Sequence, residues 1–166
     1  MSMRSIRLAV ITAAALGAMG MLTLNATASG RDEVKKRFTL FEHETNIVTV
    51  AQKSTPSVGD LLAISSDLFA DRTMAKKVGH VGVTCTTTSI TIGTAGEVLC
   101  SFTAKLEDGQ ISATGLIDVA AAITPGGRFS LPVVGGTGRF NHARGQVDFQ
   151  TLNPTTDFLD TFNLED

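Results

Sequence analysis

The stretch from Val81 to Val119, VGVTCTTTSITIGTAGEVLCSFTAKLEDGQISATGLIDV, decides the fold class of this chain. Apolar and polar residues alternate along three runs in it, Val81–Ile92, Glu97–Leu106 and Gln110–Val119. Alternation with a period of two, in runs rich in Val, Ile, Thr and Phe, is typical of β-strands. The second and third runs are separated by Glu107-Asp108-Gly109, and an Asp-Gly pair at such a place is a strong hairpin signal. The stretch therefore predicts consecutive antiparallel strands joined by short turns.

The same pattern continues on both sides of this stretch. Turn residues such as Pro125-Gly126-Gly127 and Asn153-Pro154 separate the runs. Asp71–Lys77 is predicted to form a short helical turn. Short connections favour an up-and-down arrangement, and closing the sheet removes its edge strands. We therefore predict an all-β fold, an eight-stranded antiparallel up-and-down β-barrel with the calycin shape of lipocalins. The remaining predicted strands are Phe38–Gln52 (bent or broken near Asn46), Leu61–Asp67, Phe129–Val134, Ala143–Leu152 and Phe158–Leu164.

The first residues of the chain have the pattern of an export signal. Arg4 and Arg7 precede an apolar run of about 17 residues, which is followed by the small residues Ala26-Thr27-Ala28. The alternative is a membrane anchor, but the run is short for a spanning helix and rich in Ala and Gly. We expect a signal peptide over 1–28, a flexible N-terminal segment over 29–37 and the barrel domain over 38–166. The mature protein is then expected to be secreted, without stable membrane association.

Composition excludes several classes of function. The formal net charge of −2 and the pI of about 5.9 argue against a nucleic-acid-binding protein. Two Cys are too few for a Cys₄ zinc site, and the three His have no metal-binding spacing. No phosphate-binding or dinucleotide-binding motif is present. We expect no metal and no cofactor. The chain has nine Phe but neither Trp nor Tyr, so Phe must provide all its aromatic surface.

Carboxylates continue the apolar faces of two predicted strands. Glu42 and Glu44 share a face with Phe38 and Leu40 on the first strand. Asp160 shares a face with Phe158 and Phe162 on the last one. If these faces point into the barrel, desolvation raises the pKa of a carboxyl and makes it a candidate acid or base. The alternative is that each strand emerges into water at that point.

Four segments resemble one superfamily of plant proteins. VVGGTGRFNHARGQV (133–147) resembles the signature of dirigent proteins, in which GGTGxF and ARG connect two barrel strands. GDLLAISSDLFADRTMAKKVGHVGVTC (59–85), SFTAKLEDGQISATG (101–115) and TFNL (161–164) are similar to segments of allene oxide cyclases. The resemblance implies an eight-stranded barrel with a central apolar cavity, assembled as a homotrimer and binding a small apolar molecule.

The resemblance to the cyclases also implies catalytic residues. Glu42 falls on a cavity Glu of the cyclases, Cys85 matches a Cys deep in their cavity, and Glu44 stands where they have Asn. This last difference argues against an allene oxide as the substrate. Asp160 and Asn163 replace aromatic residues of the cyclases' last strand. With Phe102 and Phe162, we expect Asp160 and Asn163 to contact the ligand.

The resemblance to dirigent proteins implies two further ligand-binding residues. Arg144 matches the Arg of their ARG run, and Asp67 lies near one of their acidic positions. In those proteins, Asp and Arg residues around the cavity steer a reactive phenolic intermediate. The alternative for Arg144 is local pairing at the rim of the barrel, as for most surface arginines.

The two cysteines have two possible roles. Cys85 and Cys100 lie on strands joined by a short hairpin, and an exported chain encounters oxidising conditions, so they are candidates for a disulfide. If the disulfide forms, Cys85 is not available as a free catalytic thiol.

Three functions compete at this stage. The first is an isomerase or cyclase that folds a reactive apolar substrate for ring closure, with Glu42 moving a proton. The second is a dirigent-like barrel that directs stereochemistry without bond chemistry of its own. The third is a non-catalytic barrel, either structural or a carrier. A structural barrel has a filled interior, so a cavity of ligand size would argue against it.

Overall fold

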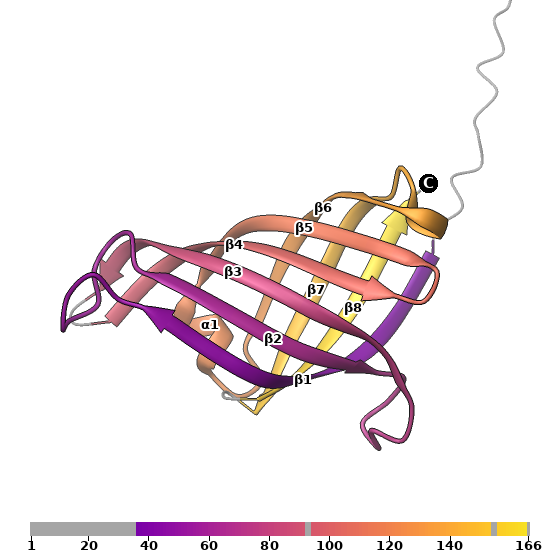
Figure 1. The fold of residues 1–166 in the computed structure, drawn as a ribbon, viewed down its shortest axis with the longest axis horizontal. Coiled ribbons are helices and arrows are strands. Elements are labelled where there is room, and N and C mark those ends of the chain that lie inside the picture. Colours follow the sequence, from indigo (N-terminus) through magenta and orange to yellow (C-terminus); the bar gives the residue numbers. More distant parts are fainter. Residues whose placement is uncertain (1–35, 92–93, 154–155, 166) are drawn as a thin grey trace, which may run out of the picture. The chain divides into compact units, whose positions relative to one another are not determined.

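The computed structural model describes residues 36–91, 94–153 and 156–165, which form a closed antiparallel barrel (Figure 1). Each strand pairs with the next along the chain, and the last pairs with the first. The predicted eight-stranded up-and-down barrel is therefore confirmed. No helix within the described ranges is long and apolar enough to cross a membrane. The strands are β1 (Lys36–Val50), β2 (Leu61–Phe69), β3 (Lys77–Thr91), β4 (Thr94–Leu106), β5 (Gly109–Asp118), β6 (Arg128–Gly136), β7 (Arg144–Asn153) and β8 (Asp157–Glu165).

The strands differ from their predicted bounds mainly at their ends. β1 begins at Lys36, within the segment expected to be flexible, and residues 29–35 of that segment and the predicted signal peptide lie outside the described residues. Of the two alternatives near Asn46, the strand is not broken: β1 runs on to Val50, and the β1–β2 register shifts between Glu44 and Asn46. The helical turn predicted for Asp71–Lys77 is wrong. Asp71 caps a hairpin loop instead, by accepting a 2.8 Å hydrogen bond from the Thr73 backbone N–H, and Lys77 already belongs to β3.

One short helix was not predicted from the sequence. α1 (Val119–Ile123) follows β5, and the side chain of Asp118 caps it by accepting a 2.8 Å hydrogen bond from Ala120 N–H. The register of β5 with β6 covers only Ile111–Ala113, so the two strands separate beyond that point. Thr151 of β7 donates its hydroxyl to backbone carbonyls of α1, at 3.0 Å and 3.2 Å. The helix therefore closes the wall of the barrel where β5 and β6 no longer pair.

The half of the barrel near the β4–β5 turn is filled by apolar side chains. Phe162, Phe102, Leu68 and Ile111 are fully buried there. The rings of Phe38 and Phe162 stack with their centroids 4.8 Å apart. A cavity inside the strands lies toward the other end of the barrel, where the 51–60 loop and α1 are found (Figure 1).

The GGTG run forms a tight corner in the packed half. Gly138 has a φ of +60°, and a Cβ at this position would collide with the backbone carbonyl of Asp108. Arg139 N–H donates a 2.8 Å hydrogen bond to the same carbonyl, and the Arg139 guanidinium pairs with the Asp108 carboxylate at 3.0 Å. The motif therefore joins the β6–β7 connection to the β4–β5 hairpin, which is a structural role.

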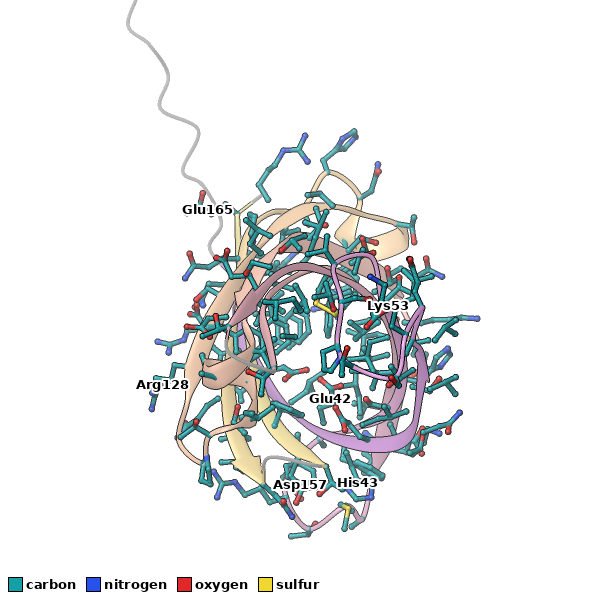
Figure 2. All side chains as sticks on the ribbon, turned by 90° about the vertical axis from the view of Figure 1, so that its left-hand side faces the viewer. Glu42, His43, Lys53, Arg128, Asp157 and Glu165 are labelled. Atoms are coloured by element: carbon teal, nitrogen blue, oxygen red, sulfur yellow. A yellow bond between two sulfur atoms is a disulfide. The ribbon has the colours of Figure 1, made fainter. Side chains whose placement is uncertain are left out.

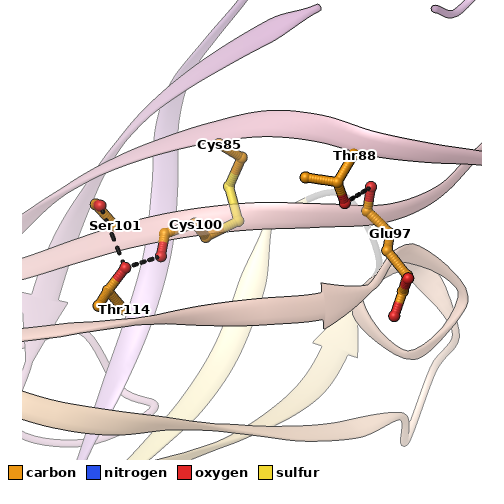
Figure 3. Close-up of a disulfide and its surroundings, with 6 residues drawn as sticks. All are labelled: Cys85, Thr88, Glu97, Cys100, Ser101 and Thr114. Carbon is orange, nitrogen blue, oxygen red and sulfur yellow. Dashed lines mark hydrogen bonds between the residues drawn. A yellow bond between two sulfur atoms is a disulfide. The ribbon is translucent and has the colours of Figure 1, made fainter. Parts of the chain in front are cut away.

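Cys85 of β3 and Cys100 of β4 form a disulfide, as the hairpin between them predicted (Figure 3). They are direct partners in the β3–β4 register, with their Cα atoms 4.1 Å apart. Beside the disulfide, the Thr114 hydroxyl donates a 2.9 Å hydrogen bond to the Cys100 carbonyl and thereby ties β5 to β4. The disulfide closes a loop with a sequence separation of 15 residues.

Replacing both cysteines by Ala should lower the free energy of unfolding by about 3 kcal/mol, because the cross-link no longer restricts the unfolded chain. Urea denaturation followed by circular dichroism measures the loss. Wild-type protein in dithiothreitol is the matched control and should unfold at the same urea concentration as the double variant. If the double variant is as stable as the oxidised wild type, the disulfide contributes nothing to stability.

Candidate functional site

A cavity of about 520 Å³ occupies the end of the barrel that carries the 51–60 loop and α1. Its walls are predominantly apolar; β1–β4, β6 and α1 each contribute two or more residues to them, and β5 contributes Ile117. β7 and β8 each add one aromatic ring, Phe149 and Phe158, and Phe149 stacks on Phe129 at 4.8 Å. Looking into this end, Figure 2 shows Glu42 inside the ring of strands and Lys53 on the loop at the mouth. The main apolar lining residues are Ile47, Leu61, Leu62, Ile64, Val83, Val98, Phe102, Ile117, Phe129, Leu131, Phe149 and Phe158.

Two carboxyl groups meet at the floor of this cavity. Glu42 of β1 lines the cavity and is only 4% exposed, and Asp160 of β8 is completely buried. The β1–β8 register places Glu42 opposite Phe158 and Asp160 opposite Leu40, so the two acids lie diagonally across neighbouring strands. Ser66 of β2, 1% exposed, adds a hydroxyl on the other side of Glu42. The predicted alternation of β1 and β8 is thereby confirmed: these acids face inward and do not emerge into water.

Burial controls the ionisation of this pair. It raises the pKa of Glu42, while the neighbouring Asp160 and Ser66 side chains lower it by hydrogen bonding. Burial raises the pKa of Asp160 well above its usual value, and the Glu42 charge raises it further. Neither oxygen of Asp160 nor the Ser66 hydroxyl makes a hydrogen bond of regular geometry, although both residues lie close enough to Glu42 to change its pKa. The Glu42 charge adds to the rise in the pKa of Asp160, whereas hydrogen bonding by Asp160 and Ser66 opposes the rise at Glu42, so Asp160 holds its proton more readily than Glu42, the member that reaches the cavity.

Glu44 stands two residues further along β1 and also lines the cavity. Desolvation, then the charges of Glu42 and Asp157, raises its pKa from 4.5 to about 7, and His43 opposes this change. His43 points away from the cavity, as its place between the two acids predicts, and its Nδ1 lies 2.8 Å from an Asp157 oxygen (Figure 2).

Asp60 and Lys53 provide the charges at the mouth. Asp60 accepts 2.8 Å hydrogen bonds from the backbone N–H groups of Gln52 and Ser57, and it fixes the two ends of the 51–60 loop. These hydrogen bonds lower its pKa, and the Lys53 charge lowers it further. Asp60 therefore stays ionised and partly balances Lys53.

Three predicted ligand-binding residues lie outside the cavity, which corrects their assignment. The side chains of Asp67 and Asn163 alternate with buried neighbours and point outward: Asp67 pairs with Lys77, and Asn163 Nδ2 donates to Asp148 at 2.7 Å. Arg144 is exposed and donates to the carbonyl of Ala143 at 3.2 Å. The resemblance located these positions along the chain, but the alternation along each strand turns the side chains away from the cavity.

The other predicted residues are placed as follows. Phe102 lines the cavity, whereas Phe162 and Asp160, which were also expected to contact the ligand, are fully buried and do not line it. Cys85 also lines the cavity, but its sulfur is bonded to Cys100. The assignment of Cys85 as a catalytic thiol is therefore wrong for this oxidised protein, since a disulfide sulfur carries no thiolate.

Sequence reasoning missed Ser66, Asp60 and Lys53. Ser66 alternates with Leu68 and Ile64 on the inward face of β2, and this pattern could have revealed it. Asp60 and Lys53 belong to a loop, where alternation gives no information. Within the described ranges, no group of three His, Cys, Asp or Glu side chains is arranged to hold a metal ion.

The comparisons with known proteins agree with this architecture. Pyocyanin demethylase superposes with a TM-score of 0.62 at 24% identity, over 75% of this chain and 98% of its own. The exo-specific intermolecular Diels–Alderase AbnU superposes with a TM-score of 0.63 at 18% identity, over 80% of this chain and 98% of its own. The Diels–Alderase AbmU from Streptomyces koyangensis superposes with a TM-score of 0.63 at 20% identity, over 78% of this chain and 63% of its own. At these identities the likeness shows a shared fold. No curated protein sequence matches the chain significantly.

The sequence also matches the family described as allene oxide cyclase barrel like domain, over residues 38–164. The match spans all eight strands, including the two that carry Glu42 and Asp160. The chain therefore belongs to the allene oxide cyclase barrel-like family.

Proposed function

We propose that this protein is an exported, cofactor-free isomerase or cyclase that acts on a small, apolar, reactive molecule in the barrel cavity. The observation that carries the proposal is the buried carboxyl pair, Glu42 and Asp160, at the floor of an apolar cavity. Buried acids with raised pKa values in a cavity are typical of proton-transfer sites.

The cavity suits a reaction within one molecule. Its volume of about 520 Å³ falls in the range of roughly 300–1,000 Å³ found for ligand sites. Apolar walls exclude water and hold a flexible chain in a folded conformation, which lowers the entropy cost of ring closure. Phe102, Phe129 and Phe149 provide flat surfaces against which unsaturated groups can pack.

Glu42 is the proposed catalytic residue because its carboxyl reaches the cavity. In an isomerisation the substrate and product have the same atoms, so a proton taken from one substrate atom is returned to another. Glu42 can accept and return this proton without another reactant. Asp160 does not line the cavity and acts as a positioning residue: the Glu42 charge raises its pKa beyond the effect of burial, so the two groups do not ionise together.

The names of the structural neighbours support ring formation. Two of them are Diels–Alderases, which close a ring inside the same kind of barrel, whereas the third is a demethylase. One frame thus serves more than one reaction, so the proposal depends on the residues in the cavity of this chain.

The cavity argues against the structural barrel with a filled interior. A dirigent-like role depended on Arg144, which is exposed on the outside of the barrel. It also predicts binding without proton transfer, so the experiment on Glu42 below separates the two functions.

Export and assembly are parts of the same proposal. The disulfide supports an oxidising compartment, in agreement with the signal-peptide pattern of residues 1–28. A homotrimer is supported by an apolar pair on the outer surface, Leu99 and Leu116, which are partners across β4 and β5 and are 47% and 57% exposed.

Replacing Glu42 by Gln should abolish proton transfer in the cavity. The probe is 5-nitrobenzisoxazole, an apolar bicycle: when a base removes its ring proton, the N–O bond breaks and the ring opens to 2-cyano-4-nitrophenolate, the conjugate base of an isomer of the probe. We expect the wild type to accelerate this reaction and E42Q to lose about 100-fold or more of the acceleration, because Gln cannot accept the proton. Absorbance of the phenolate measures the rate.

Glu97→Gln is the matched control, since Glu97 is an exposed glutamate on the outer face of β4. It should react at the wild-type rate. A wild-type rate no higher than that of acetate in buffer, or an unchanged rate in E42Q, contradicts the catalytic role of Glu42.

The buried acids also predict how stability depends on pH. Folding raises the pKa of Asp160 well above 3.8 and that of Glu44 from 4.5 to about 7, so the folded state binds these protons more tightly than the unfolded chain. The contribution of these two groups to stability is therefore greatest below about pH 4. This contribution falls as the pH rises through their pKa values in the folded protein.

Asp160→Asn should weaken this fall, because Asn has nearly the same shape and cannot ionise. Urea denaturation at pH 4, 6 and 8 measures the free energy of unfolding. The comparison variant E44Q should remove only the loss of stability between pH 4.5 and about pH 7, the range set by the pKa values of Glu44. If the stability of D160N and that of the wild type change in the same way with pH, the raised pKa of Asp160 is contradicted.

A further inference from the structure

The cavity combines apolar walls with charges of mainly one sign. Its acidic members are Glu42 and Glu44 on β1 and Asp60 at the mouth, and Lys53 is the basic residue among the described lining residues. The lining residues described on β3–β7 are all uncharged. Asp60 partly balances Lys53 at the mouth, so the field deep in the cavity comes from the acids of β1.

Glu42 and Glu44 line one wall, two residues apart on the inward face of β1. The groups that act on Glu44 are Glu42 and His43 on its own strand and Asp157 on β8, while its partner on β2 is the uncharged Ser66. His43 faces outward and binds Asp157, and its effect on Glu44 only partly offsets the charges of Glu42 and Asp157. The described side chains of β1 that line the cavity include no cation beside Glu44.

The floor below this wall is also short of hydrogen-bond partners. Both oxygens of Asp160 and the hydroxyl of Ser66 are buried without a regular hydrogen bond. Buried polar groups of this kind are costly unless they are balanced. A positive charge placed over Glu42 stabilises its carboxylate, and the Asp160 and Ser66 hydroxyl groups can then orient toward that carboxylate.

We infer that the cavity selects apolar, ring-containing ligands that carry a positive charge, and that this charge lies against Glu42 and Glu44. The inference rests on the proposed function only in that the cavity is the binding site, and it names the substrate class. An anionic ligand of the same shape is repelled by Glu44 and Asp60. A neutral ligand of that shape gains the apolar contacts but not the attraction of the carboxylates.

Binding of a permanent cation must then be linked to protons. The cation favours ionised Glu44, whose pKa without ligand is about 7. Affinity for the cation therefore rises as the pH increases from 5.5 to 8.5, and binding near pH 7 releases a proton. A neutral ligand shows little of this dependence, because it interacts similarly with both forms of the carboxyl group.

Three fluorescent probes of nearly the same shape test the inference. N-methylacridinium is a permanent cation, 9-methylanthracene replaces its charged nitrogen by carbon, and anthracene-9-carboxylate is an anion. Fluorescence titration of the full mature chain at pH 8.5 should show the cation binding about tenfold or more tightly than the neutral probe, and the anion binding most weakly, since one unit of pKa is a tenfold change in affinity.

Two variants locate the effect. E44Q should lose most of the cation preference and its dependence on pH, yet bind 9-methylanthracene as the wild type does. E97Q removes a glutamate from the outer face and should keep both the preference and the pH dependence. Because Glu44 is half-buried near the mouth, its conservative replacement leaves the packed half of the barrel intact.

The possible outcomes are distinct. Equal affinity of the cationic and neutral probes, or a cation preference that survives in E44Q, overturns the charge selection while leaving the cavity as a binding site. Failure of all three probes to bind overturns both the inference and the proposal that the cavity holds a ligand. Loss of proton transfer in E42Q with no cation preference supports the proposed function alone.

Discussion

The closure of eight strands into a barrel forces every second side chain into an interior that water scarcely enters. Everything else in this structure depends on that constraint. Apolar residues at the inward positions pack together, as Phe102, Phe162 and Leu68 do. Carboxyl groups at inward positions cannot reach bulk water, so their pKa values rise and their protons become available for chemistry. The same alternation thus builds the core and creates the candidate site.

The interior is divided into two halves with different roles. In one half the large side chains and the GGTG corner fill the space, and this dense packing provides a rigid floor. In the other half, the β5–β6 pairing ends early, and the inward side chains and α1 surround a cavity. Glu42 and Asp160 lie at the boundary between the halves. Their environment combines the low polarity of a core with access for a ligand, which is the condition for an effective buried acid or base.

Much of the fold follows from local patterns in the chain. The alternation of Val98, Cys100 and Phe102 correctly predicted an inward face of β4, and the Asp108-Gly109 pair correctly predicted a hairpin. The disulfide was a candidate because the two cysteines lie on β3 and β4, which a short hairpin joins. By contrast, α1 was missed because five residues are too few to show a helical period, and its formation depends on Thr151 of β7, far away in the sequence.

Alternation along the chain was sufficient to indicate a barrel and to place Glu42, Glu44 and Asp160 on apolar faces, because the side-chain period of a strand is a local property. Alternation did not show that Glu42 and Asp160 meet, since their proximity depends on the register between the first and last strands, which only closure establishes. Nor did it exclude Arg144, Asp67 and Asn163 from the cavity. The resemblance to other proteins matched their positions along the chain, but only the tertiary structure determines whether each side chain points into the barrel or away from it. The ionisation of the pair was likewise decided by the folded protein, since a pKa responds to every neighbour that the fold brings together.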